Sequence, residues 1–90
     1  AYYMADLENY IDKDITVVVE SVKPLEIKSP QGFRAVSMET AFKGEAGSSI
    51  TAFIPDEFFD SFSKFYAEAG KEFTGLLYKQ DGEVVLVYRR

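Results

Sequence analysis

The chain has 90 residues and a mass of 10.2 kDa, which leaves room for one hydrophobic core and one domain. Apolar residues make up 47% of it and charged residues 28%, a globular composition that excludes a disordered chain. Cysteine and histidine are both absent, which excludes disulfide scaffolds, thiol redox chemistry, zinc fingers and histidine-dependent catalytic triads. We therefore expect a protein that is not an enzyme and carries no cofactor.

The N-terminal residues and the lengths of the apolar runs indicate where in the cell the protein is expected. No run approaches the ~20 apolar residues that span a bilayer, and residues 1–10 lack the basic and apolar regions of a signal peptide. We expect a cytoplasmic protein without membrane contact. Met4 reads as a natural start preceded by added residues 1–3, so residues 1–10 are expected to be an extension to a single domain over 11–90.

The net charge of −5 is unevenly distributed along the chain. Residues 1–12 hold three acids and no base, and residues 44–70 hold five acids with Lys64 as the only base. Residues 13–43 and 71–90 each carry one excess positive charge. Because the acidity is segregated, the weakly basic segments are free to contact a polyanion, although the charge map does not require such a partner.

Five segments are predicted as strands, because each is apolar or β-branched and bounded by turn residues: 15–22, 33–42, 49–54, 71–79 and 83–88. Pro24 interrupts the first strand, so any continuation through Leu25 and Ile27 is expected to be bent, bulged or on an edge. A first strand that bends in its middle, near Pro24, would suit a barrel. Pro30 and Gly32 predict a turn before the second strand, and residues 43–49 a flexible glycine-containing loop before the third. Asp81–Gly82 is typical of a primed hairpin turn between the last two strands.

Between the third and fourth strands the apolar period changes from two to 3.6 residues. The residues of one helical face are Phe58, Phe62, Phe65, Tyr66 and Ala69. Pro55 suits a first helical turn, and Gly70 suits a left-handed cap. We therefore expect a helix over about residues 56–69 that buries Phe58, Phe62 and Phe65 against the sheet.

The predicted order is β-β-β-α-β-β, an all-β chain with one helix. Over residues 11–90 this order resembles the OB-fold, a five-stranded Greek-key barrel with a helix between its third and fourth strands. The resemblance rests on element order and not on a signature motif. It implies a non-enzymatic module that binds single-stranded nucleic acid, with DNA expected in preference to RNA. A small phage or plasmid accessory protein would be of this kind. An SH3-like barrel and an open α+β sheet are the alternative folds.

Alternation along the second and third strands predicts which side chains face outward. If Met38 and Ile50 point into the barrel with their apolar neighbours, Phe33 and Phe53 point out of it on adjacent strands. OB-folds stack unpaired bases on aromatic rings at this place. We expect Phe33 and Phe53 to form such a platform, the alternative being that they pack beneath the bent first strand or a loop. The basic residues expected to contact phosphates are Lys23, Lys28, Arg34, Lys43 and Lys79.

The net charge of −5 also supports a second hypothesis, a protein-interaction module on the same barrel. A protein partner, or further copies of the chain, would dock on the strand face or on the N-terminal tyrosines. The close carboxylates of Asp12 and Asp14, and of Asp56 and Glu57, match no EF-hand or HExxH spacing. We therefore predict neither a metal site nor a catalytic site.

Overall fold

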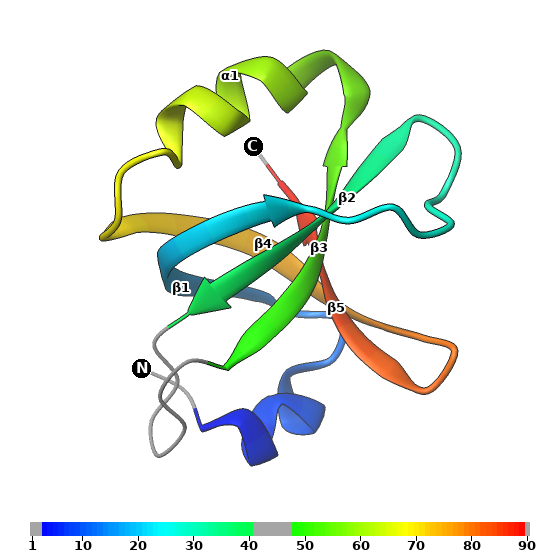
Figure 1. Cartoon of the computed structure of the whole chain (residues 1–90). Helices are drawn as coiled ribbons and strands as arrows, with labels where there is room; N and C mark the ends of the chain where they lie inside the picture. Colours follow the sequence, from blue (N-terminus) through cyan, green and yellow to red (C-terminus); the bar gives the residue numbers. More distant parts are fainter. Residues whose placement is uncertain (1–2, 41–47, 90) are drawn as a thin grey trace.

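Five strands close into a barrel in the computed structural model, which describes residues 3–40 and 48–89 (Figure 1). The strands are β1 (Asp14–Pro24), β2 (Phe33–Thr40), β3 (Ser49–Pro55), β4 (Lys71–Gln80) and β5 (Glu83–Tyr88). Their order around the barrel is β1-β2-β3-β5-β4, and only β3 and β5 run parallel among these pairs. The predicted all-β fold with one helix is confirmed, the open sheet is excluded, and the closed barrel is consistent with an OB-like fold.

The first strand pairs with two neighbours, one through each half. Residues 14–19 of β1 lie opposite β4, residues 19–24 lie opposite β2, and the register shifts between Val19 and Ser21. A strand bent in its middle is thus confirmed. The expectation that Pro24 causes the bend is wrong, because Pro24 is the last residue of β1, where a residue without an N–H is tolerated.

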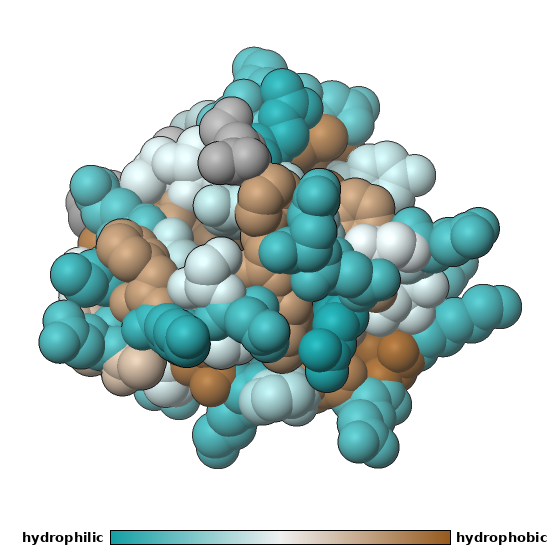
Figure 2. Space-filling view, turned by 90° about the horizontal axis from the view of Figure 1, so that it is seen from above, coloured by the Kyte–Doolittle hydropathy of each residue, from teal (hydrophilic) through white to brown (hydrophobic). Residues whose placement is uncertain are grey.

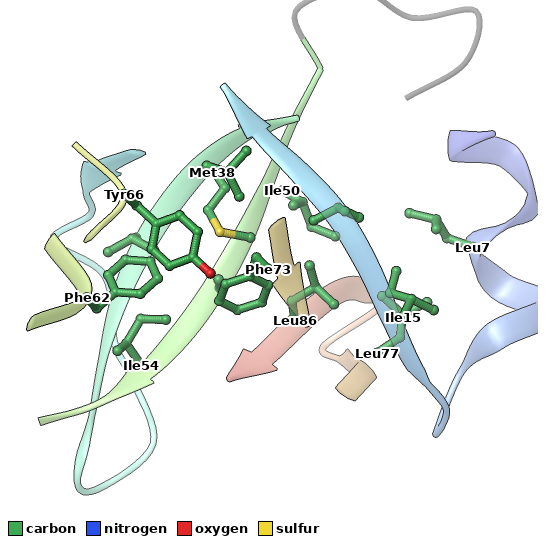
Figure 3. Packing of buried hydrophobic residues seen from close by; sticks show 14 residues of the cluster. Leu7, Ile15, Met38, Ile50, Ile54, Phe62, Tyr66, Phe73, Leu77 and Leu86 are labelled. Atoms are coloured by element: carbon green, nitrogen blue, oxygen red, sulfur yellow. The ribbon is translucent and has the colours of Figure 1, made fainter. Parts of the chain in front are cut away.

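The barrel interior is filled by the alternate side chains that the sequence pattern predicts to face inward (Figure 3). Met38, Ile54, Phe73, Leu77 and Leu86 are among its fully buried side chains. One end of the barrel is closed by the 3₁₀ helix η1 (Met4–Tyr10), which contributes the buried side chain of Leu7. Part of the predicted N-terminal extension therefore completes the core.

A short helical segment closes the opposite end. It consists of the 3₁₀ turn η2 (Asp56–Phe58) and helix α1 (Phe59–Phe65), which is shorter than the predicted 56–69. Phe62 is buried, with its ring centroid 4.7 Å from that of Tyr66 and 6.0 Å from that of Phe73. Phe58 is half-buried and Phe65 is 53% exposed, so their predicted burial is wrong. The 3₁₀ start changes the angular spacing of the side chains, and Tyr66 fills the position expected for Phe65.

Three residues confirm the predicted turns. Gly70 has a φ of +92° and its N–H donates to the Val19 carbonyl at 2.9 Å. Asp81 and Gly82 have φ values of +51° and +82°, as a type I′ hairpin turn requires. Pro55 differs from expectation, since it ends β3 instead of beginning a helix. Within the described part of the chain, no helix has the length and apolar character needed to cross a membrane.

Replacement of Phe62 by alanine is expected to lower the free energy of unfolding by ~3–5 kcal/mol, because it opens a cavity under the helical end of the barrel. Phe65→Ala is the matched control, since its exposed ring should cost below ~1 kcal/mol. Urea unfolding of both variants checks this prediction. Equal losses at the two positions would contradict the observed packing.

Tyr66 provides a pH test of the same region. Burial, and secondarily the nearby Tyr88, raise the pKa of Tyr66 to about 12 from 10.0. Its hydroxyl donates to the Glu72 carbonyl at 2.6 Å. Because the unfolded phenol loses its proton near pH 10.0 and the folded one near about 12, this group's contribution to stability is lost as the pH rises through that window. Urea unfolding across this pH window should show that the free energy of unfolding falls less steeply with pH for Tyr66→Phe than for the parent protein. Parallel declines in the two proteins would contradict the raised pKa of Tyr66.

Candidate functional site

A second apolar cluster lies on the outside of the barrel, over β2, β3 and β5. Ala35, Phe53 and Val85 are its buried members, and Leu25 and Phe33 are among the partly buried residues that pack against it. The loop that joins β1 to β2 covers this surface. This 25–32 loop is held at its start by a hydrogen bond from the Leu25 N–H to the Ala35 carbonyl at 3.0 Å.

This covering corrects the predicted stacking platform. Phe53 faces outward as the alternation predicts, yet it is only 3% exposed, because the 25–32 loop packs Leu25 over the same cluster. Phe33 is half-buried beside it. The expectation that both rings are exposed is therefore wrong, and the alternative, that they pack beneath a loop, is what the structure shows.

The predicted basic residues are not gathered on one surface. The Arg34 guanidinium lies 3.9 Å from the ring centroid of Phe59, the first residue of α1. The Lys79 ammonium lies 3.1 Å from a carboxylate oxygen of Glu8 in η1, at the opposite end of the barrel (Figure 1). Lys43 lies outside the described residues. Arg34 and Lys79 therefore cannot serve one short stretch of a ligand together.

The acidic start of the helical segment adjoins β2. The Asp56 N–H donates to the carbonyl of Gly32, the residue before Phe33, at 2.9 Å. The carboxylates of Asp56 and Glu57 are both exposed at this end of the strand. A phosphate would be repelled here, so the Phe33 end of β2 is a poor position for a polyanion.

A groove of about 490 Å³ lies between the 25–32 loop and the hairpin turn that joins β4 to β5. We call it the loop groove; its lining residues are Lys28, Ser29, Pro30, Tyr78, Gln80 and Asp81. Tyr78 is 46% exposed and pairs in the sheet with Val85 of the outer cluster. An exposed aromatic ring therefore stands at the wall of the groove, next to the covered apolar surface.

The charges around the loop groove differ from those at the helical end. Lys28 lines the groove and is exposed, as is Lys23 near the end of β1, and neither lysine forms an ion pair with any residue that the structure describes. Asp81 is the acidic residue of the lining. A cation without a partner beside an exposed ring can neutralise an anion while the ring stacks on a planar group.

The sequence reasoning missed Tyr78, because both faces of residues 73–78 are apolar enough to be buried. The sequence did contain a signal for Tyr78, which lies on the outward face of its strand three residues before the Asp81 turn. This position predicts an aromatic ring at the edge of the last hairpin. Among the predicted site residues that the structure describes, only Lys28 lines the loop groove.

Comparison with known proteins adds no relative from which a role could be transferred. No protein-family model matches the chain, and a search of curated proteins found no match.

Phe53→Ala is expected to destabilise the fold by ~3–5 kcal/mol, because the ring is buried beneath the 25–32 loop. Tyr78→Ala removes a half-exposed ring and should change stability by less than ~1 kcal/mol. Thermal and urea unfolding measure both effects. A Phe53→Ala protein that keeps full stability would show that the loop does not hold that ring.

Proposed function

We propose that the protein is an OB-fold module that binds single-stranded nucleic acid, and that the loop groove is its binding site. The groove itself carries this proposal. It lies between the β1–β2 loop and the β4–β5 turn of a closed five-stranded barrel, and OB-folds bind oligonucleotides with the loops at these two places. Tyr78 takes the stacking role that the sequence suggested for Phe53, and Lys28 keeps its predicted phosphate contact.

The binding expected from such a groove is weak and tolerant of sequence. A base stacked on an aromatic ring contributes ~1–3 kcal/mol without base-specific hydrogen bonds. Lys23 is an additional phosphate contact on β1, whereas Arg34 and Lys79 have other partners. One ring and two cations give modest affinity for each copy, so tight binding requires several copies along one strand.

A protein partner is the second candidate for the same surface. Ile27, the residue before Lys28 of the groove lining, is 51% exposed on the 25–32 loop. The net charge of −5 opposes a polyanion at long range and favours this alternative. The two candidates differ in mechanism, because only binding to nucleic acid releases condensed counterions and weakens steeply with salt.

A fluorescence titration with oligo-dT at ~50 and ~200 mM salt tests the proposal. Tyr78→Ala should raise the dissociation constant ~5–150-fold at low salt, which corresponds to one lost stack. Tyr3→Ala is the matched control, since Tyr3 is a similarly exposed tyrosine at the start of η1, and it should bind as the parent does. Repeating the titration with oligo-U compares RNA with DNA.

Lys28→Glu tests the phosphate contact in the same titration. It should weaken binding and reduce the log–log salt slope by about one. Lys64→Glu on α1 makes the same change of net charge away from the loop groove, so it separates a local contact from a general field effect. Equal effects of the two charge reversals would count against the proposal. An affinity of the parent protein that does not change with salt concentration would also count against it, and would favour a protein partner.

A further inference from the structure

A second pocket lies at the helical end of the barrel, on different elements from the loop groove. It has a volume of about 300 Å³ and is lined by Phe58, Ser61, Phe62, Phe65, Tyr66 and Tyr88. Figure 2 looks onto this end and shows apolar side chains between hydrophilic ones. We call it the aromatic pocket, because five of its six lining residues carry rings.

The rings come from η2, α1, the turn after α1, and the end of β5. Tyr88 has its centroid 6.3 Å from that of Phe58 and 6.2 Å from that of Phe62. The centroid of Tyr66 lies 4.7 Å from that of Phe62 and 4.9 Å from that of Phe65. Interplanar angles of 41° to 80° show that these neighbouring rings contact one another in tilted or edge-to-face arrangements, and the same rings line the pocket. Phe65 keeps one side open, since about half of its surface is exposed.

Aromatic faces attract cations, and this pocket already shows the interaction. The Lys71 ammonium lies 5.2 Å from the centroid of Phe65, while the same ammonium pairs with Glu68 at 3.7 Å. Beside Tyr88, the Arg89 guanidinium is occupied by Asp14 at 3.7 Å. Lys71 and Arg89 are therefore each paired with a carboxylate.

The charge of the helical segment also favours a cation. Four exposed carboxylates lie between residues 56 and 68: Asp56, Glu57, Asp60 and Glu68. Lys64 is the base within the same range. The segment therefore attracts a positive ligand and repels phosphate, so the aromatic pocket does not extend the nucleic-acid site proposed above.

The hydroxyl groups of the pocket indicate which kind of cation fits. The Ser61 hydroxyl donates to the Phe58 carbonyl at 3.1 Å, and the Tyr66 hydroxyl donates to the Glu72 carbonyl at 2.6 Å. A primary ammonium brings three N–H donors, for which the pocket lining offers as side-chain acceptors only the hydroxyl oxygens of Ser61, Tyr66 and Tyr88. A quaternary ammonium has no N–H, and its methyl groups gain from apolar contact while its charge interacts with the rings.

We propose that the aromatic pocket binds the trimethylammonium group of a small choline-like cation. Phe58, Phe62, Phe65, Tyr66 and Tyr88 supply the ring surfaces, and the carboxylates of the helical segment supply the field. The ligand carries no anionic group of its own, because these carboxylates would repel one. This binding is independent of the nucleic-acid function, since the two sites share no lining residue.

Titration of the intact protein with choline chloride, followed by amide NMR shifts, tests this inference. The matched control ligand is the uncharged isostere in which carbon replaces the quaternary nitrogen. Choline should bind ~10-fold more tightly than the isostere, as a desolvated cation–π contact requires, and should shift amides of residues 58–66 and of Tyr88. Phe65→Leu keeps an apolar side chain at an exposed position, and should weaken choline binding at least ~3-fold without changing thermal unfolding.

Three results would overturn the inference. Equal affinity for choline and its isostere would reduce the pocket to a hydrophobic cavity. The absence of saturable shifts at these residues would remove the site. Tighter binding of phosphocholine than of choline would show that an anionic group is preferred, contrary to the charge of the segment. Oligonucleotide binding is measured separately, so failure here leaves the loop groove unaffected.

Discussion

Closure of the barrel depends on β1, which pairs with β4 and then with β2 around one register shift. The shift between Val19 and Ser21 lets 11 residues serve two sides of the barrel. Closure also requires a glycine at position 75 of β4, where the backbone lies close to its neighbours. A Cβ at Gly75 would lie 2.7 Å from the Phe73 ring and 2.9 Å from the Val87 carbonyl oxygen. The parallel pairing of β3 with β5 then completes the barrel.

The remaining features follow from this closure. A five-stranded barrel has a narrow interior that side chains fill, but both of its ends must be covered. Leu7 of η1 contributes to one end, and Phe62 with Tyr66 covers the other (Figure 3). Closure also sets the 25–32 loop and the β4–β5 turn on either side of the loop groove. The two candidate sites thus differ in composition: the loop groove has an exposed ring beside a lysine, and the aromatic pocket has a set of rings beside carboxylates.

The sequence predicted elements wherever local chemistry decides the structure. The alternation in β2 and β3 indicated the inward side chains, and Asp81–Gly82 indicated a turn whose two positive φ values the structure confirms. Alternation assigns a side chain to a face, but it does not show what covers that face. Phe53 was assigned to the correct face and to the wrong environment for this reason.

Other features depend on contacts between distant segments. The extent of the helical face was overestimated because a 3₁₀ turn precedes α1, so Tyr66 and not Phe65 enters the core. The loop groove brings together residues 28–30 and 78–81, and the aromatic pocket joins α1 to Tyr88. Neither juxtaposition has a local sequence signal. Both follow only once the barrel order is established.

Amide NMR mapping of the intact protein with a short oligo-dT tests the central claim most directly, because it locates the binding site without a substitution. Binding in the loop groove predicts amide shifts concentrated at residues 28, 29 and 78–82, with little change in α1. Shifts confined to α1, or no shifts at low salt with an oligonucleotide long enough to cross the groove, would contradict the account.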